Sequence, residues 1–545
     1  MVVRPAYVNR LVRSSCMVVF GVAICLAAAG CGSGRSTSNA TSASRVGVFT
    51  NGTRTGETPV RGGVLAFARS VQATELDPAL SSTNAGGYIL PQIFDQLVEQ
   101  LPGSTLLQAG VASSWSISAD GLTYDFQLRH DVRFSNGAQL TASDVVFTLH
   151  RLASPVNTNS AAFHFPLRNV TARTPHEVRV ILSHPVPAFI LDLSDPIASI
   201  VPATVVSHES EAQFGQRPVG SGAFVVKSFT PGKSLVLARN PYYWRSGQPY
   251  LNSVVFTNTP DANQRILAVQ SGQANVADAI PYDQAATLLH ASGVKLVVIP
   301  LAEVDAGYWN DGKAPFTDIA VRRALNYATP RDALIKHVYQ GLATPANSII
   351  PKNAYWDASV PPYRYDPVKA KQLIATSSVP HGFSMTLMIP SGDPGDSTTA
   401  QILQAAWAQI GVRVTLRPLD FGTLVTQFFA GNYDMVLFPS GSEENSDPAP
   451  DALADLFYNY NDGSHAEGTF WNNPQEIALT QQAATATSET VRRQLYRNLQ
   501  SISQSLAQEL PLVFAPALNL VSGKVRDFTT LPGGSWRLEQ VWLAP

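Results

Sequence analysis

Residues with the chemistry of a catalytic or metal site are scattered along this 545-residue chain. Ser292 and Lys295 have the S-x-x-K spacing of some acyl-transferring serine enzymes, but neither K-T-G nor S-D-N accompanies them, and no G-x-S-x-G occurs. The ten histidines form no H-x-H or H-E-x-x-H pattern, which a metal site built on clustered ligands would favour. We therefore do not expect an enzyme, a metal site or a cofactor.

The first 31 residues have the anatomy of an export signal. Three arginines precede an apolar run over residues 17–30, which is shorter than the roughly 20 residues of a membrane-spanning helix. Residues 26–31 read LAAAGC and resemble a bacterial lipobox, so Cys31 is the expected site of lipidation. An ordinary secretory signal and an uncleaved anchor are the alternatives. Because Cys16 and Cys25 lie in this leader, a chain beginning at Cys31 has no second thiol for a disulfide.

Composition sets the class of the remainder. Residues 31–61 are rich in Ser, Thr, Gly and Asn and predict a disordered tether that reaches about 30 Å. The following residues are too many for one core and predict two or three domains. With 38 basic and 40 acidic residues and no basic stretch, the chain is not expected to bind nucleic acid.

Residues 111–152 predict a compact unit of strands and a helix. Apolar and polar residues alternate over residues 122–128, which predicts a strand with one buried face, and Asp120-Gly121 supplies the turn before it. Residues 132–134 predict a second short strand. Thr141 and Asp144 have the spacing of a capping box, so a helix should follow. Its apolar face is expected to carry Val145, Leu149 and Leu152.

Periodicity elsewhere alternates between strands and helices, which favours a mixed α/β protein. Further strands are expected at residues 64–68, 178–182, 234–238, 254–257 and 412–416. One amphipathic helix is expected after Asp318 and should stop before Pro330, and a second is expected over residues 399–410.

The order of the pieces in residues 111–152, W-x4-DGLTY-x-F-x-LR-x2-V-x-F-x2-G-x2-LTA-x-DVVFT, resembles the signature of the family 5 extracellular solute-binding proteins. These are the peptide, oligopeptide and nickel receptors of ABC importers. Similar blocks occur at residues 62–80, 218–244, 260–277, 314–338 and 538–543. The resemblance implies an α/β fold of the periplasmic-binding-protein-like class II, with two lobes, a hinge and an extra inserted subdomain.

The resemblance also implies a division of the chain. Residues 1–30 are the signal peptide and residues 31–61 the tether. The remaining parts are lobe I at residues 62–97, 183–307 and 508–545, an inserted subdomain of lobe I at residues 98–182, and lobe II at residues 308–507.

One predicted ligand contact is an acidic anchor. In peptide-binding members a carboxylate four residues before a proline holds the ligand's ammonium group, and the matching position here is Glu444, with Asn445 and Asp447 in the same segment. A buried ammonium needs a charged acceptor, because a charge-assisted hydrogen bond is roughly twice as strong as a neutral one. The alternative is a solvated acidic loop.

Other positions bear on how the ligand lies and on its size. Gln72, Ala73 and Thr74 match the segment whose backbone pairs with peptide in oligopeptide receptors, although a plain strand end is an equal alternative. Dipeptide receptors have an arginine where Asp393 stands, and peptide receptors tend to have a tryptophan where Gly441 stands. An aspartate repels a ligand carboxylate and a glycine widens the pocket, so a ligand longer than a dipeptide is expected.

The expected function is that of a lipid-anchored, monomeric receptor on the outer face of a bacterial cytoplasmic membrane. It would capture extracellular peptides in a cleft between the lobes and deliver them to ABC permease subunits with ATPases behind them. A receptor for a bulky non-peptide ligand such as haem, or a sensory lipoprotein on the same scaffold, is the alternative.

Overall fold

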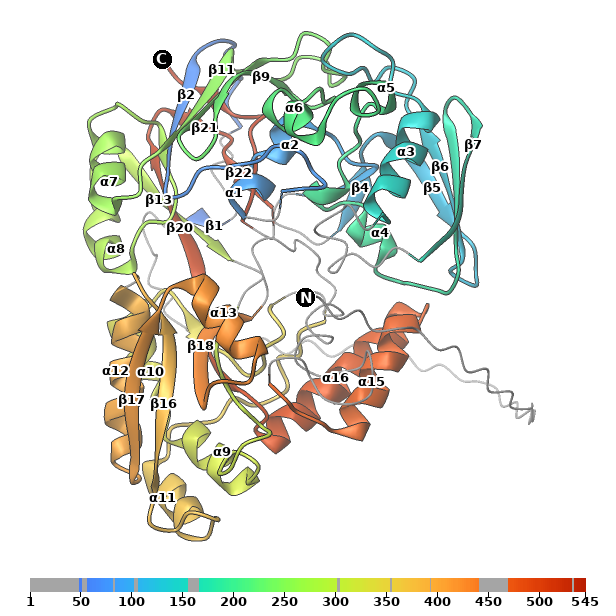
Figure 1. The fold of residues 1–545 in the computed structure, drawn as a ribbon. Helices are drawn as coiled ribbons and strands as arrows, with labels where there is room; N and C mark the ends of the chain where they lie inside the picture. Colours follow the sequence, from blue (N-terminus) through green and yellow to red (C-terminus); the bar gives the residue numbers. More distant parts are fainter. Residues whose placement is uncertain are drawn as a thin grey trace, which may run out of the picture. The chain divides into compact units, whose positions relative to one another are not determined.

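The structure is a computed structural model of the chain, and the described residues are 49–50, 56–81, 84–101, 106–154, 166–300, 304–352, 355–392, 394–440, 469–531 and 534–545. In these residues strands form an eight-stranded, a six-stranded and a four-stranded sheet together with three two-stranded sheets. The fold is mixed α/β with two lobes, as the sequence predicts (Figure 1). We call the part built on the eight-stranded sheet lobe I and the part built on the six-stranded sheet lobe II.

The eight-stranded sheet has its longest parallel contact in its interior, between β2 and β11. In sheet order its strands are β1 (Phe49–Thr50), β13 (Val294–Pro300), β20 (Pro516–Ser522), β12 (Val276–Ala277), β2 (Val64–Arg69), β11 (Ser253–Asn258), β10 (Ser234–Arg239) and β9 (Phe224–Thr230). Strands β11 and β12 flank β2 in parallel, and β12 and β13 both run antiparallel to β20. The carboxyl ends of β2, β11, β12 and β13 therefore share one edge of the sheet.

The six-stranded sheet has the same kind of edge. Its strands, in order, are β15 (Thr344–Pro345), β19 (Leu510–Phe514), β14 (Val304–Trp309), β18 (Met435–Ser440), β16 (Phe383–Pro390) and β17 (Val412–Leu419). Strand β16 pairs in parallel with both β17 and β18, whereas β14 runs antiparallel to β18 and sets Val304 opposite Ser440. The carboxyl ends of β16, β17 and β18 thus lie where β14 begins.

The chain passes between the two large sheets at two neighbouring places. One crossing runs from Pro300 at the end of β13 to Val304 at the start of β14, and the other passes through Ala515 between β19 and β20. Within the sheets Pro300 pairs with Pro516, and Asp305 pairs with Val513, so the two crossings lie side by side. The residue limits predicted for the lobes remain a proposal, since these crossings define sheets and not domain boundaries.

The inserted subdomain, as we use the term here, comprises the four-stranded sheet and helix α3. In order its strands are β5 (Ala112–Ile117), β6 (Thr123–Leu128), β8 (Glu177–Leu182) and β7 (Leu167–Thr174). The predicted strand at residues 122–128 is confirmed as β6, and α3 (Ala142–Leu152) begins with the predicted Thr141–Asp144 capping box. The helix buries Val145, Leu149 and Leu152 as expected. The second strand expected at residues 132–134 is wrong, because only an isolated bridge between Arg133 and Gln139 forms there.

The two helices predicted for lobe II are both present. Helix α9 (Ile319–Tyr327) is capped by Asp318, whose side chain accepts a hydrogen bond from Ala320 N, and it ends before Pro330. Helix α12 (Pro394–Ala408) starts five residues earlier than position 399, consistent with the tolerance of a first helical turn for proline. The strands predicted elsewhere are confirmed as β2, β8, β10, β11 and β17.

The remaining elements are short strands and helices around these sheets. The two-stranded sheets pair β3 (Val98–Gln100) with β4 (Leu107–Ala109), β21 (Val525–Arg526) with β24 (Trp542–Leu543), and β22 (Thr529–Thr530) with β23 (Trp536–Arg537). Helices up to the first crossing are α1 (Asn84–Gly87), α2 (Leu90–Ile93), α4 (Phe189–Asp192), η1 (Pro196–Ala198), α5 (Ala203–Val206), α6 (Glu211–Gln216), α7 (Ala262–Gln270) and α8 (Tyr282–Leu288). Later helices are α10 (Arg331–His337), α11 (Pro367–Ala375), α13 (Phe421–Phe429), α15 (Pro474–Thr485) and α16 (Glu489–Leu506), of which α15 and α16 pack together (Figure 1).

Candidate ligand-binding site

The carboxyl edge of the eight-stranded sheet is fixed by a buried ion pair between two strands. Arg69 ends β2 and Asp278 follows β12, and Arg69 Nε lies 3.2 Å from Asp278 Oδ2. Ser70 N donates a 2.7 Å hydrogen bond to the other oxygen, Asp278 Oδ1. The Arg69 guanidinium also lies 5.0 Å from the centre of the Trp536 ring. These contacts set the direction in which the chain leaves β2.

The predicted peptide-pairing residues follow directly. Gln72 is 2% exposed, and its Oε1 accepts a 3.0 Å hydrogen bond from Ala73 N. The carbonyl oxygen of Ala73 accepts a 2.9 Å hydrogen bond from Gly232 N, so the backbone of Ala73 is bonded within the protein. Thr74 is exposed. Of the three, Thr74 is therefore the residue with surface to offer a ligand, and the contact itself stays a prediction.

The turn after this segment ties lobe I to the inserted subdomain. Arg151 near the end of α3 donates two hydrogen bonds to the fully buried carboxylate of Asp77, Nη1 to Oδ1 at 2.6 Å and Nη2 to Oδ2 at 2.5 Å. Upstream, Glu75 Oε1 accepts hydrogen bonds from the backbone N of Leu76 and of Asp77. The edge that carries Thr74 is thus held rigidly from both ends.

The matching edge of lobe II leads into the other predicted contacts. Strand β16 ends two residues before Gly392, and β18 ends at Ser440. Because β16 and β18 are parallel neighbours, their carboxyl ends lie at the same edge of the sheet. Ligands of α/β proteins bind outside the carboxyl ends of parallel strands. The predicted residues Asp393, Gly441, Glu444, Asn445 and Asp447, like Cys31, lie outside the described residues, so their roles stay predictions.

Lobe II contains a buried acidic cluster that the sequence did not predict. Arg322 Nε lies 3.8 Å from Asp311 Oδ1, and Glu476 and Glu509 are buried close by. Burial raises the pKa of Asp311 well above its ordinary value although Arg322 opposes the shift, and burial raises the pKa of Glu476 to about 8. Trp471 Nε1 donates a 2.5 Å hydrogen bond to Glu476 Oε2. The local sequence signal is that Glu476 lies in the first turn of α15, where a negative charge interacts favourably with the helix dipole.

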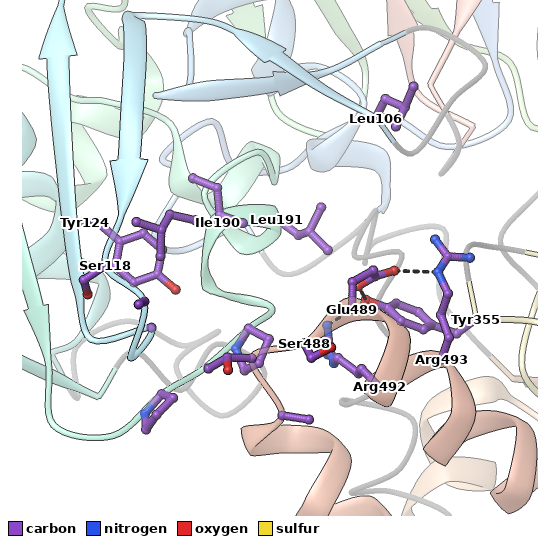
Figure 2. Close-up of a pocket in the computed structure, with 17 residues that line it drawn as sticks. Leu106, Ser118, Tyr124, Ile190, Leu191, Tyr355, Ser488, Glu489, Arg492 and Arg493 are labelled. Atoms are coloured by element: carbon purple, nitrogen blue, oxygen red, sulfur yellow. Dashed lines mark hydrogen bonds and ion pairs between the residues drawn. The ribbon is translucent and has the colours of Figure 1, made fainter. Parts of the chain in front are cut away.

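A cavity of about 790 Å³ lies between the inserted subdomain and the start of α16 (Figure 2). It has the size of a small-molecule pocket. On one side it is lined by Ile117 and Tyr124 of the subdomain sheet and by Ile190 and Leu191 of α4. On the other side it is lined by Tyr355 and by residues 486–489, 492 and 493 at the junction of α15 and α16. We call it the Figure 2 cavity.

The polar side of the Figure 2 cavity is a connected network. Arg492 Nη1 donates a 2.8 Å hydrogen bond to Tyr355 Oη, which donates a 3.0 Å hydrogen bond to Glu489 Oε2. Arg493 Nε lies 2.8 Å from Glu489 Oε1. The guanidinium of Arg492 also faces the Tyr355 and Tyr496 rings, with its central carbon 4.9 and 5.8 Å from their centres.

Comparison with known proteins places this architecture in context. The family model for bacterial extracellular solute-binding proteins, family 5 middle, matches residues 107–464. Heme-binding protein A of Haemophilus influenzae is 30% identical over 478 residues, covering 81% of this chain and 85% of the relative. Glutathione-binding protein GsiB of Escherichia coli is 28% identical over 472 residues, covering 86% of this chain and 92% of the relative.

A solved structure confirms the class of fold. The periplasmic binding protein DppA of Helicobacter pylori, in complex with the peptide STSA, superposes with a TM-score of 0.76 and 24% identity, covering 89% of this chain and 99% of that one. At this identity the likeness concerns the fold alone. Among the described residues of the present chain, no helix is both long and apolar enough to cross a membrane.

Proposed function

The chain belongs to the bacterial extracellular solute-binding proteins of family 5, and from this membership we propose that it captures an extracellular peptide longer than a dipeptide for an ABC permease. The observation that carries the proposal is the topology of the two large sheets. In each of them the carboxyl ends of parallel strands lie at the edge where the chain crosses to the other sheet. A ligand between these edges touches segments of both lobes.

Binding without chemistry follows from that geometry. The two crossings are adjacent, so they permit rotation of one lobe relative to the other. A ligand contacts both edges only when they approach each other, and its binding energy therefore shifts the population toward the closed form. A permease that recognises the closed form would accept loaded receptor in preference to empty receptor.

A peptide suits these edges because its backbone carries regular donors and acceptors. Exposed backbone near Thr74 would pair with an extended peptide, as in strand addition. Glu444, four residues after the end of β18, would hold the ligand's ammonium group. The negative charge of Asp393 after β16 would disfavour a dipeptide, whose carboxylate lies close to its ammonium.

The name of one relative favours a second candidate ligand. Heme-binding protein A is 30% identical to this chain, and a haem carries carboxylates on a large apolar body. GsiB is named for glutathione, which is a tripeptide. Two relatives with such different ligands indicate that the pocket, and not the scaffold, sets specificity.

We propose further that Cys31 carries the lipid and that residues 32–61 tether the receptor to the outer face of the cytoplasmic membrane, where it acts as a monomer. A single acyl chain binds a membrane only marginally, so stable anchoring needs the several chains of a lipoprotein cysteine. Cys31→Ser is expected to release the protein from washed membranes into the soluble fraction. Retention of Cys31→Ser on membranes would indicate an uncleaved leader as the anchor.

The anchor hypothesis is tested by calorimetric titration with a tetrapeptide that has a free amino terminus. Glu444→Gln should weaken binding by about 1.5–3 kcal/mol, the value of a hydrogen bond to a charged group. Glu443→Gln is the matched control, because it removes the same charge one residue away and should leave the affinity within about twofold. Equal affinities for Glu444→Gln and the parent protein would move the anchor to another residue.

A further inference from the structure

The Figure 2 cavity has two chemically different sides. The subdomain side carries Ile117, Pro185, Pro187, Ile190 and Leu191, and Figure 2 shows the labelled Ile190 and Leu191 across the cavity from Arg492 and Glu489. Tyr124 Oη donates a 3.3 Å hydrogen bond to Val186 O, which holds the 185–191 segment against the sheet. This side offers an apolar surface to an occupant.

The α16 side is cationic in composition. Among the described residues that line the cavity, the charged ones are Arg492, Arg493 and Glu489, an excess of one positive charge. Glu489 is in contact with Arg493 and with Tyr355 Oη. Arg492 is 1% exposed, and its guanidinium is held in place by the Tyr355 and Tyr496 rings. Arg492 therefore contributes its positive charge from within the cavity wall, while Arg493, whose side chain is 48% exposed, has the surface that an anion can reach.

The amino-terminal end of helix α16 adds to the positive potential on this side of the cavity. The helix has 18 residues and begins at Glu489, so the positive end of its dipole lies at the cavity. The hydroxyl of Ser488 caps it by accepting a hydrogen bond from Val491 N. The field of this terminus and the two arginines have the same sign, and both favour a negative group on this side.

We propose that the Figure 2 cavity is a second ligand site that binds a carboxylate attached to an apolar body. The carboxylate lies on the Arg492 side and the apolar body lies against Ile117, Ile190 and Leu191. Its volume of about 790 Å³ admits one such molecule of moderate size. The carboxylate belongs either to the carboxyl-terminal residue of a peptide or to a free fatty acid, since the two share this chemistry.

Occupancy of this site would bear on the contact between the subdomain and lobe II. A Cβ built on Gly121 would lie 2.9 Å from Thr487 Cγ2, so the turn before β6 already packs against the α15–α16 junction beside the cavity. An occupant that contacts both sides extends this junction and stabilises it. The proposal makes no use of Glu444, so either proposal can fail while the other holds.

The test is calorimetric titration of the protein, purified as the cell exports it, with two pairs of probes. The first pair is N-acetyl-leucyl-leucine and its carboxyl-terminal amide, and the second pair is octanoate and octanamide. Acetylation removes the ammonium that the Glu444 anchor requires, so binding of these probes reports on the cavity alone. We expect at least one acid to bind tenfold or more tightly than its amide, and the acid that binds identifies the source of the carboxylate.

Variants of Ile117 locate the binding. Ile117 is 44% exposed, so its replacement leaves the core intact. Ile117→Asp should weaken binding of the acid probe tenfold or more through charge repulsion. Ile117→Asn, whose side chain has the same shape as aspartate but no charge, should weaken that binding less than threefold. Equal binding of acid and amide, binding of neither acid, or equal affinities in the Asp and Asn variants would overturn the proposal. A tetrapeptide with a free amino terminus and a carboxyl-terminal amide should bind Ile117→Asp as it binds the parent protein, which separates this site from the anchor.

Discussion

Buried carboxyl groups have different surroundings in lobe I and in lobe II. Within lobe I, Arg245 Nη2 lies 2.5 Å from Glu99 Oε2, and Arg537 Nη2 lies 3.4 Å from the same oxygen. Arg245 Nη1 also lies 3.3 Å from Glu539 Oε1. In the lobe II cluster three acids, Asp311, Glu476 and Glu509, lie near the guanidinium of Arg322.

The difference shows two ways of burying a carboxyl group. A nearby guanidinium favours the charged form of a buried carboxyl group, whereas burial and neighbouring acids favour the protonated form. Asp95 is the exception in lobe I, because burial and the nearby Glu99 raise its pKa to about 6. The stabilisation linked to protonated Asp95 should therefore be lost by about pH 6, whereas that linked to protonated Glu476 should continue to be lost up to about pH 8.

The largest expected effect comes from breaking the lobe I network. Glu99→Gln leaves Arg245 and Arg537 buried without their shared carboxylate, and removal of one partner of a buried pair costs about 3–5 kcal/mol of unfolding free energy. Denaturant unfolding at pH 7 measures the loss. The control is Glu177→Gln, which breaks the more exposed pair with Arg173 and should cost less than about 1 kcal/mol. Equal losses in the two variants would contradict a matched buried network.

The next effect is a pH dependence that belongs to lobe II. Because the folded-state pKa of Glu476 is about 8 and its ordinary value is 4.5, the folded state binds more protons within that window. Stability is therefore present at low pH and is lost as the pH rises. Between pH 6 and 8 the loss from this group is about 2 kcal/mol. Unfolding curves at the two pH values should show that loss in the parent protein and a smaller one in Glu476→Gln; an unchanged difference would contradict the account.

A smaller effect should appear in lobe I at lower pH. The pKa of Asp95, about 6, also lies above its ordinary value of 3.8, so the sign is the same but the window ends earlier. Between pH 5 and 6 the loss of unfolding free energy from Asp95 alone is about 1 kcal/mol. Asp95→Asn should remove this part and leave the change between pH 7 and 8 intact. If Asp95→Asn altered stability between pH 7 and 8 instead, the separation of the two lobes by pH would be wrong.

The smallest effect concerns the contact between the subdomain and lobe II. Gly121 has a φ of 69°, and an added Cβ would press on Thr487. Gly121→Ala should cost about 1 kcal/mol from the left-handed backbone alone. Thr487→Ser in the same background should recover the part that comes from the clash. Thermal unfolding of the single and double variants separates the two contributions, and no recovery would mean that the contact is too loose to matter.

Local features of the fold were predictable from the sequence, and long-range ones were not. The Thr141–Asp144 capping box and the alternation in β6 depend on neighbours within a few residues, so they could be found directly. Residues 132–134 have a strand-like pattern but form only a bridge, since β5 and β8 occupy both sides of β6. Family resemblance supplied the two-lobed topology, which periodicity could not.

The candidate site likewise depends on long-range contacts that the sequence could not predict. The pairs Arg69–Asp278 and Arg151–Asp77 join residues 209 and 74 positions apart, and no local pattern identifies such partners. The cavity beside α16 joins the 185–191 segment to residues 486–493 for the same reason. The ligand contact of Thr74 comes from resemblance and stays a prediction, and Glu444 and its neighbours lie outside the described residues.

The most direct test of the central claim, that the protein captures peptides between two lobes, is mass spectrometry of whatever co-purifies with the untagged protein lacking its leader. The account predicts a mixture of peptides of three or more residues with varied sequences, released when the protein is denatured. Recovery of one defined non-peptide molecule, with no peptides, would contradict it.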